Sequence, residues 1–180
     1  MLVWVVEHRT PALDWLFVAL SAAGTAGLLW IGLAAVLAYL ARKPLVATVA
    51  ITAATVWTAD LIAVTLKPIV DRDRPYVVVP EPEPLLRWDV NASFPSGHAA
   101  TSAAGAVILA YLIGRWAWGL ALLAIAVSYS RVYVGLHYPL DVLAGAAIGA
   151  AVALLAVLVL RRLRPTSAGR RRSAQATPGG

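Results

Sequence analysis

The 180-residue chain contains no cysteine. This absence excludes disulfide bonds, a thiolate nucleophile and cysteine-ligated metal sites together. Charge is scarce as well, because Asp, Glu, Lys and Arg supply 13% of the residues whereas hydrophobic residues supply 61%. A soluble domain of this length rarely carries so much apolar side chain. The shortage of charge therefore argues against a soluble globular protein.

Long apolar runs take the place of the missing charge, and the mean hydropathy is +0.77. The runs recur at lengths of about 20 residues, which a helix needs to cross ~30 Å of hydrocarbon. The expected fold class is therefore all-α, a polytopic transmembrane helical bundle. The first run, "MLVWVVEHRTPALDW", lacks the basic start and the small-residue cleavage site of a signal peptide, so no segment is expected to be removed.

Proline, glycine and charged pairs divide the chain into segments. Residues 1–23, which Pro11 interrupts, predict an N-terminal interfacial or amphipathic helix; if they crossed the bilayer, the bundle would have six spans. The segment 68–95 has five prolines in its first seventeen residues and is expected to be a loop. Residues 24–163 then form one membrane-embedded domain, and residues 164–180 form a basic, disordered tail. Five spans are expected within that domain, over residues 24–41, 45–66, 97–114, 117–134 and 140–162.

Charges of opposite sign separate in this arrangement. All nine acidic residues lie towards one side of the membrane. The other side carries basic residues alone, namely Arg42, Lys43, Arg115, Arg161, Arg162, Arg164, Arg170, Arg171 and Arg172. The positive-inside rule makes the basic side cytoplasmic, so the C-terminus is cytoplasmic and the N-terminus and loop 68–95 are extracytoplasmic, at the cell membrane. The net charge of +6 accompanies no nucleic-acid-binding motif, so the expected partner is the lipid bilayer and not nucleic acid.

Three polar stretches reach the extracytoplasmic surface. "KPIVDRDRP" places Lys67 at the end of the second span and Arg74 seven residues later, "PSGH" opens the third span at 95–98, and "SRVYVGLHYPLD" joins the fourth and fifth spans. A helix start beside arginine and lysine is an anion site, because its N–H groups point at the ligand and a guanidinium matches phosphate oxygens. Two histidines in such a site suit a nucleophile and an acid for phosphoryl transfer.

The same stretches carry a resemblance to a known family. The patterns K-x6-RP, PSGH and SR-x5-H-x3-D, in this order across residues 67–141, resemble the three signature motifs of the type 2 phosphatidic acid phosphatase (PAP2) family. That group of lipid phosphatases also includes vanadium-dependent haloperoxidases. The resemblance covers the expected catalytic core and leaves the first span and the tail unmatched. It implies a metal-independent phosphatase, without a cofactor, that forms a phosphohistidine intermediate.

The resemblance also implies roles for individual residues. His137 is the expected nucleophile that attacks phosphorus, and Asp141 orients it and stabilises its positive charge. His98 is expected to protonate the leaving oxygen and then to activate water. Fixed donors stabilise the negative charge on the phosphoryl oxygens. The expected donors are Lys67, Arg74, Ser96, the Gly97 amide and Arg131.

Residues beside the third motif refine this expectation. Pro139 suits the first position of a helix, so His137 is expected just outside the fifth span and Asp141 in its first turn. Gly135 permits backbone conformations that other residues disfavour, which helps to aim His137.

Polar residues outside the motifs have their own interpretations. Asp60 lies seven residues, or about two helical turns, before Lys67. Because an ionisable residue within a span suggests function, we expect Asp60 to hold a polar network beneath the site; the alternative is a hydrogen bond to a neighbouring helix. His8 is interpreted as a residue without a role in the site. The loop residues Asp71, Arg72, Asp73 and Arg87 are interpreted as loop charges or local ion pairs. The tryptophans near span ends, Trp88, Trp116 and Trp118, are interpreted as part of an aromatic belt at the membrane surface.

The leading functional hypothesis is an integral-membrane lipid phosphatase that acts at the outer membrane boundary. Undecaprenyl or another polyprenyl diphosphate is the preferred substrate, and phosphatidylglycerolphosphate, phosphatidate and polyprenyl-phosphosugars are alternatives. The rivals are a vanadate-binding haloperoxidase, a channel or transporter, and a non-catalytic lipid-binding protein. The charges gather at one surface and do not form a path across the bilayer, which disfavours a channel or transporter. A non-catalytic lipid-binding protein would need neither His98 nor Asp141, so their presence disfavours that alternative. The oligomeric state stays open, since the small residues "AGAAIGAA" at 144–151 permit close packing within one bundle or between chains.

Overall fold

The structure is a computed structural model that describes residues 2–79, 83–86 and 91–163. These residues form helices joined by turns and loops, without a strand, which confirms the expected all-α class. The predicted tail at 164–180, with Arg87 and Trp88, lies outside the described residues. The helices are α1 (Leu2–Glu7), α2 (Pro11–Ala23), α3 (Leu28–Leu40), α4 (Leu45–Val70), α5 (Pro75–Val78), α6 (Gly97–Ile113), α7 (Ala117–Tyr133) and α8 (Pro139–Leu163), with a short 3-10 turn, η1 (Thr25–Gly27), between α2 and α3.

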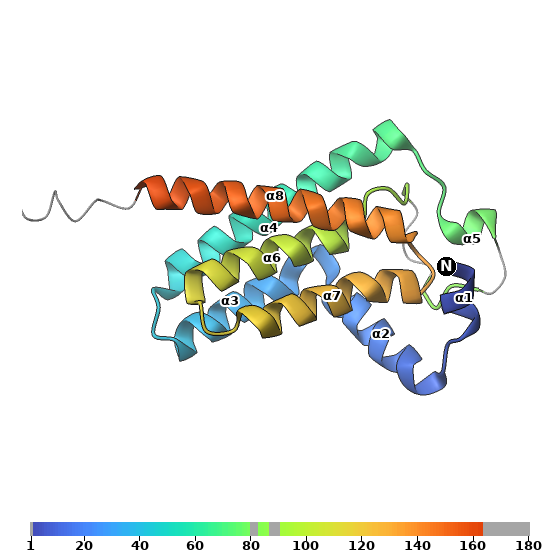
Figure 1. The fold of residues 1–180 in the computed structure, drawn as a ribbon, viewed down its shortest axis with the longest axis horizontal. Helices are drawn as coiled ribbons and strands as arrows, with labels where there is room; N and C mark the ends of the chain where they lie inside the picture. Colours follow the sequence, from blue (N-terminus) through green and yellow to red (C-terminus); the bar gives the residue numbers. More distant parts are fainter. Residues whose placement is uncertain (1, 80–82, 87–90, 164–180) are drawn as a thin grey trace, which may run out of the picture.

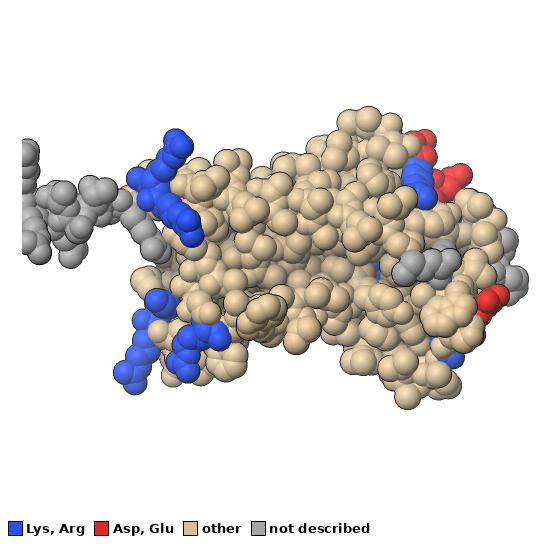
Figure 2. Space-filling model, in the orientation of Figure 1, with Lys and Arg blue, Asp and Glu red and all other residues tan. Residues whose placement is uncertain are grey.

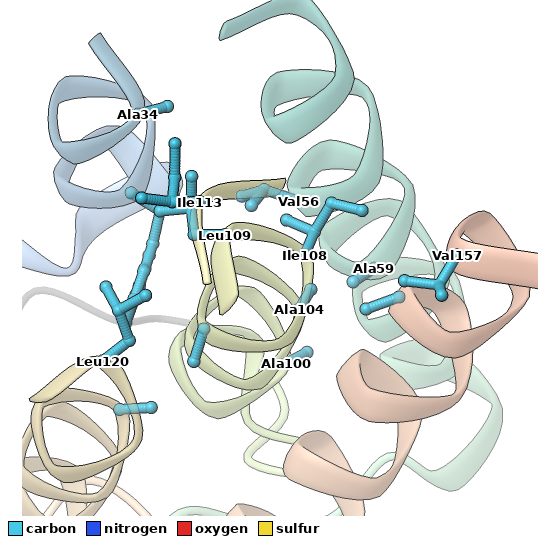
Figure 3. Close-up of a cluster of buried hydrophobic side chains, with 14 of the residues drawn as sticks. Ala34, Val56, Ala59, Ala100, Ala104, Ile108, Leu109, Ile113, Leu120 and Val157 are labelled. Carbon is cyan, nitrogen blue, oxygen red and sulfur yellow. The ribbon is translucent and has the colours of Figure 1, made fainter. Parts of the chain in front are cut away.

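Helix α6 lies at the centre of the bundle, with α3, α4, α7 and α8 packed around it (Figure 1). Its Ile108 and Leu109 are fully buried and belong to one apolar cluster with Val56 of α4, Leu120 of α7 and Val157 of α8 (Figure 3). Lipid tails are as apolar as leucine, so the hydrophobic effect does not hold helices together inside a membrane, and close packing does. Contacts between helix backbones therefore matter in this fold.

Two glycines of α8 allow it to approach α6 closely. A Cβ atom on Gly149 would lie 2.0 Å from the carbonyl oxygen of Ala100, and one on Gly145 would lie 2.2 Å from the carbonyl oxygen of Ser96. Real Cβ atoms do not come so near to backbone atoms, so only glycine fits at either place. The small residues at 144–151 thus pack α8 against α6 within one bundle, and they bring the start of α8 beside the start of α6.

The membrane spans differ in part from those expected. Within the described residues, α8 and the stretch Leu45–Val78 are long and apolar enough to cross a membrane, while α6 and α7 are shorter apolar helices of 17 residues each. The predicted span at 24–41 is not one continuous helix, because Ala26 and Gly27 adopt left-handed backbone conformations and break it. Helix α2 and the η1–α3 segment, which are bent by 56° relative to each other, are long and apolar enough to cross a membrane only if they are counted as one broken span. Helix α4 also runs through Pro68 to Val70, four residues beyond its predicted end at 66.

Charged side chains gather at the two ends of the molecule (Figure 2). One end, formed by the α3–α4 and α6–α7 turns and the end of α8, carries Arg42, Lys43, Arg115, Arg161 and Arg162. Acidic residues gather at the opposite end, which also holds the start of α6 and of α8. Apolar side chains cover the surface between the ends, and several are largely exposed, such as Trp118 at 86% and Val46 at 80%. A lipid bilayer is the solvent that suits such a surface.

Candidate active site

A cavity of about 200 Å³ lies at the acidic end of the bundle. Five of the eight predicted site residues line it: Lys67, Arg74, Gly97, His98 and His137. Gly24 and Ala26, from the break between α2 and α3, form another part of its wall. The three sequence motifs begin at Lys67 and end at Asp141, 74 positions later, and each contributes to the lining of one cavity.

His137 lies in the connection between α7 and α8 and is 2% exposed. Its backbone N–H donates to the carbonyl of Arg131 (3.1 Å), which continues the end of α7. Gly135 has a φ of 82°, a left-handed conformation that suits glycine, and α8 begins at Pro139. The expectation that His137 precedes the helix is confirmed.

The neighbours of His137 fix which ring nitrogen carries the proton. Arg74 Nη1 lies 3.3 Å from His137 Nε2. A guanidinium can only donate, so Nε2 is the acceptor and its lone pair is unprotonated. The proton of the neutral ring is then on Nδ1, which lies 3.6 Å from Asp141 Oδ2. That distance is longer than a hydrogen bond, so the carboxylate faces the ring without yet bonding to it.

The environment also keeps this ring neutral. Burial is the largest cause that lowers the pKa of His137, to about 4, and the positive charges of Arg131, Arg74 and Lys67 add to it, while Asp141 opposes them. The ordinary pKa of histidine is about 6.5. His137 is therefore uncharged near neutral pH, and its Nε2 lone pair can attack an electrophile that displaces the hydrogen bond from Arg74.

Asp141 is fully buried and held from two sides. Arg72 Nη1 donates to its Oδ1 (2.9 Å), and the Tyr138 N–H donates to its Oδ2 (2.9 Å). Interpreting Arg72 as a loop charge or a local ion pair was wrong, since its partner is 69 residues away and belongs to the site. Its guanidinium also lies 4.1 Å from the centroid of the Tyr138 ring. A buried carboxylate needs such partners to stay charged.

The basic residues of the first motif are tied to loop backbone. Lys67 Nζ donates to the carbonyl of Ala92 (2.6 Å), and Arg74 Nε donates to that of Asn91 (2.7 Å). Arg74 Nη1 also donates to the carbonyl of Leu136 (3.0 Å), immediately before His137. Lys67 and Arg74 are 9% and 3% exposed. Each cation is therefore fixed in place before a ligand arrives.

The "PSGH" stretch forms the start of α6. Ser96 is the N-cap, and its Oγ accepts from the Ala99 N–H at 3.4 Å. The Ser96 N–H donates to the carbonyl of Asp141 (2.9 Å), which joins the starts of α6 and α8. His98 follows on the first turn and lines the cavity, as does Asp60 of α4. A Cβ on Gly97 would lie 2.9 Å from Asp60 Oδ1, so Asp60 belongs to the cavity wall itself and not to a layer beneath it.

Arg131 differs from the other predicted cations. It is 3% exposed but is not among the described residues that line the cavity, and neither are Ser96 and Asp141. Its Nη1 donates to the hydroxyl of Ser21 on α2. The carbonyl of Ser21 also accepts from His98 Nε2 (3.1 Å). Ser21 could not be identified from sequence, because a serine in an apolar helix has no distinctive pattern.

A second set of contacts from the N-terminal segment was also not predicted from the sequence. Arg9 Nε donates to the carbonyl of Tyr133 (2.8 Å), and the Tyr133 hydroxyl donates to Asp14 Oδ1 (2.8 Å). Partial burial lowers the pKa of Arg9, although Asp14 opposes this effect. These contacts fasten α2 to the end of α7, four residues before His137.

Comparisons with known proteins agree with this arrangement. An undecaprenyl-diphosphatase of Sulfolobus acidocaldarius is 45% identical over 80 residues, which are 44% of this chain and 36% of the relative. A decaprenylphosphoryl-5-phosphoribose phosphatase of Mycobacterium tuberculosis is 39% identical over 103 residues, which are 53% of this chain and 52% of the relative. The chain thus matches about half, or less, of the length of these curated relatives.

A solved structure shares the fold. It is a transmembrane PAP2-type phosphatidylglycerolphosphate phosphatase from Bacillus subtilis, with a TM-score of 0.72 and 24% identity over 89% of this chain and 82% of its own. The apolar surface described above and the helices long enough to cross a bilayer identify a membrane protein. Residues 44–165 match the family model described as "PAP2 superfamily". This match covers more than half of the chain and contains all three motifs, so the chain belongs to the PAP2 superfamily.

Proposed function

We propose that the protein is an integral-membrane phosphatase that hydrolyses a lipid phosphate or diphosphate through a phosphohistidine at His137. The observation that carries this proposal is that one cavity is lined by His137, by His98 and by two buried cations, Lys67 and Arg74. The Nε2 atom of His137 is unprotonated there. A phosphate group is the ligand that this charge and this nucleophile suit. The family membership and the names of the relatives support the same reaction class.

The first half of the reaction transfers the phosphoryl group to the protein. His137 Nε2 attacks phosphorus and the P–O bond to the lipid breaks. His98 starts this step protonated on both ring nitrogens and gives the Nδ1 proton to the leaving oxygen, since its Nε2 hydrogen is donated to the Ser21 carbonyl. The product ring carries phosphorus on Nε2, a proton on Nδ1 and a positive charge. Asp141 stabilises that charge from 3.6 Å, and a small movement would close this gap to a hydrogen bond.

The second half regenerates the enzyme. Water attacks the phosphohistidine, His98 accepts a proton from it, and the P–N bond breaks to release inorganic phosphate. Lys67, Arg74 and the Gly97 amide, which line the cavity, hold the phosphoryl oxygens throughout. Arg131 and the Ser96 hydroxyl, which do not line it in this structure, turn towards the phosphoryl group when it binds. Preorganised donors of this kind are typically worth about 3–4 kcal/mol each when removed.

Polyprenyl diphosphate is the substrate we favour. One relative is an undecaprenyl-diphosphatase, and another acts on a decaprenylphosphoryl sugar phosphate by its name. Both substrates join a long prenyl tail to a phosphate group, which suits a polar cavity at the end of an apolar bundle. Phosphatidylglycerolphosphate, phosphatidate and polyprenyl-phosphosugars are the alternatives to be compared with it.

The charge distribution supports an orientation. The end with Arg42, Lys43, Arg115, Arg161 and Arg162 is cytoplasmic by the positive-inside rule, so the cavity opens at the extracytoplasmic boundary. A C-terminal tag should then be inaccessible from outside intact cells, and external labelling of that tag would reverse the orientation.

Phosphate release by the purified protein in detergent tests the proposed function. Polyprenyl diphosphate and the alternative lipid phosphates should be hydrolysed in EDTA, vanadate should inhibit, and His137→Ala should abolish turnover. Full activity in that variant would refute the mechanism, and loss of activity in EDTA would refute the metal-independent reaction. Halide oxidation with vanadate and peroxide, without phosphate release, would favour the haloperoxidase instead.

A further inference from the structure

We propose that Ser21, in the N-terminal helix α2, is a positioning residue of this site. It holds Arg131 through its hydroxyl and His98 through its backbone carbonyl. The inference rests on the proposed function, since it concerns how the phosphate-binding and proton-transfer groups are held. It also extends the working site beyond the family match at 44–165 and into residues 1–23, which sequence analysis assigned to a separate interfacial segment.

The contacts of Ser21 are the first support. Ser21 is 1% exposed, although α2 is otherwise mostly apolar and exposed. Its Oγ accepts from Arg131 Nη1, and its carbonyl oxygen accepts from His98 Nε2 at 3.1 Å. A single residue therefore contacts one member of the second motif and one member of the third.

The attachment of α2 to the bundle is the second support. Tyr133 of α7 accepts from the Thr10 N–H (3.2 Å) through its hydroxyl and donates to Asp14, so it binds the start of α2. Phe17 packs on the Tyr133 ring with centroids 4.3 Å apart. Asp14, Phe17 and Ser21 are spaced by three and four residues, so they share one face of α2. This face is fastened to α7, and Ser21 is therefore held in a fixed place.

The two contacts act on different steps. The hydroxyl contact orients Arg131, a buried guanidinium that needs an acceptor, so it governs affinity for the phosphoryl group. The carbonyl contact requires a hydrogen on His98 Nε2, because a carbonyl oxygen only accepts, and it thereby orients the ring. A side-chain substitution removes the first contact and keeps the second. Ser21→Ala should consequently change phosphate affinity and leave the pH dependence that arises from His98 unaltered.

The experiment measures KM for a lipid phosphate and the inhibition constant of vanadate, in detergent, for wild type and Ser21→Ala. Both constants should rise about tenfold, the effect of losing one hydrogen bond to a charged group. A merely structural role would reduce the folded fraction and so lower the apparent kcat, while KM and the vanadate constant stayed at wild-type values. Ser21→Cys, which keeps the volume but accepts weakly, should behave like Ser21→Ala and serves if the alanine variant does not fold.

Thr25→Ala is the matched control. Thr25 lies four residues further along, is exposed, and its hydroxyl donates to the nearby carbonyl of Ala22 (2.7 Å), so its removal should leave both constants unchanged. In an Arg131→Ala background, Ser21→Ala should have no further effect on kcat/KM. Unchanged or tighter vanadate binding in Ser21→Ala would overturn the role of Ser21. So would a fall in kcat/KM on adding Ser21→Ala to Arg131→Ala that is as large as the fall it causes in wild type. Failure of wild type to release phosphate would instead overturn the proposed function.

Discussion

Arg72 donates a 2.9 Å hydrogen bond to Asp141, a fully buried carboxylate whose other oxygen faces the ring of His137. Arg72 is therefore linked to His137, the proposed nucleophile, through Asp141. Its side chain is 35% exposed, so solvent screens part of the interaction.

Replacing Arg72 should slow catalysis. In Arg72→Ala, the Asp141 carboxylate loses the hydrogen bond to Oδ1, keeps the one from the Tyr138 N–H to Oδ2 and orients His137 less well, so kcat should fall about tenfold. Arg72→Lys keeps the charge but not the planar fork, and it should recover only part of the rate. Steady-state kinetics in detergent measure both effects, with Arg42→Ala at the other end of the bundle as the control. A wild-type kcat in Arg72→Ala would contradict the role assigned to this pair.

Gly149 should be intolerant of any side chain. In Gly149→Ala the new Cβ would lie 2.0 Å from the carbonyl of Ala100, so α8 must move away from α6. Overpacking of this kind costs about 1–3 kcal/mol, and the shift should also displace Asp141 at the start of α8. Thermal unfolding in detergent and phosphate release should both show the loss.

Gly119→Ala is the matched control for that change. A Cβ on Gly119 of α7 would meet nothing within 4 Å. Because alanine favours helix over glycine by up to about 1 kcal/mol, Gly119→Ala should leave stability unchanged or slightly higher. Equal behaviour of the two variants would show that α8 does not depend on close approach to α6.

The pH dependence of the reaction should report the environment of His137. Its pKa is lowered to about 4, so its contribution to the acid limb of kcat/KM should lie near that pH. Lys67→Met removes one of the charges that lower this pKa and should move the limb to higher pH, whereas Lys43→Met at the far end should not. An acid limb that stays in place, or moves to lower pH, in Lys67→Met would contradict this assignment.

The same pKa has a consequence for stability. The folded-state pKa lies below the ordinary value of 6.5, so the unfolded chain binds the His137 proton first as pH falls. His137 should therefore make the protein less stable as pH decreases from about 6.5 towards 4, and its contribution should level off below that. Unfolding midpoints of wild type and His137→Asn across this range measure the effect, and wild type should lose stability relative to the variant as pH falls from about 6.5 towards 4.

Asp60 provides a further test. Its carboxylate lines the cavity beside Gly97 and interacts electrostatically with Lys67. Asp60→Asn should lower kcat/KM several-fold, because Lys67 loses a fixed opposite charge. Asp73→Asn, in the connection after α4, is the control. If Asp60→Asn changes neither activity nor thermal stability, the functional hypothesis for Asp60 is wrong.

Local signals in the sequence predicted much of the site. Pro139 marks the first residue of α8, Ser96 caps α6, and Gly135 takes the left-handed conformation that aims His137. Each of these features depends on residues close in sequence, where backbone preferences decide the outcome. The apolar runs likewise predicted the helical class and four of its long segments to within a few residues.

Features that depend on distant contacts could not be predicted. Ser21 acquires its partners only because α2 packs on α7, and Arg72 contacts Asp141 only because the end of α4 lies beside the start of α8. The boundary between the N-terminal segment and the first span was predicted at 23/24, whereas the break lies at Ala26 and Gly27, because apolar residues continue through it and do not mark its place. The single sequence therefore identified the motif residues but not the residues that hold them.

Trapping of the covalent intermediate tests the central claim most directly. His98→Ala, mixed with a substrate whose leaving group needs no proton, such as p-nitrophenyl phosphate, should be phosphorylated but slow to react with water. Rapid quenching in base and peptide mass spectrometry should then find an acid-labile phosphate on His137, and none in His98→Ala/His137→Ala. Turnover without an adduct, or an adduct on any other residue, would contradict the phosphohistidine mechanism.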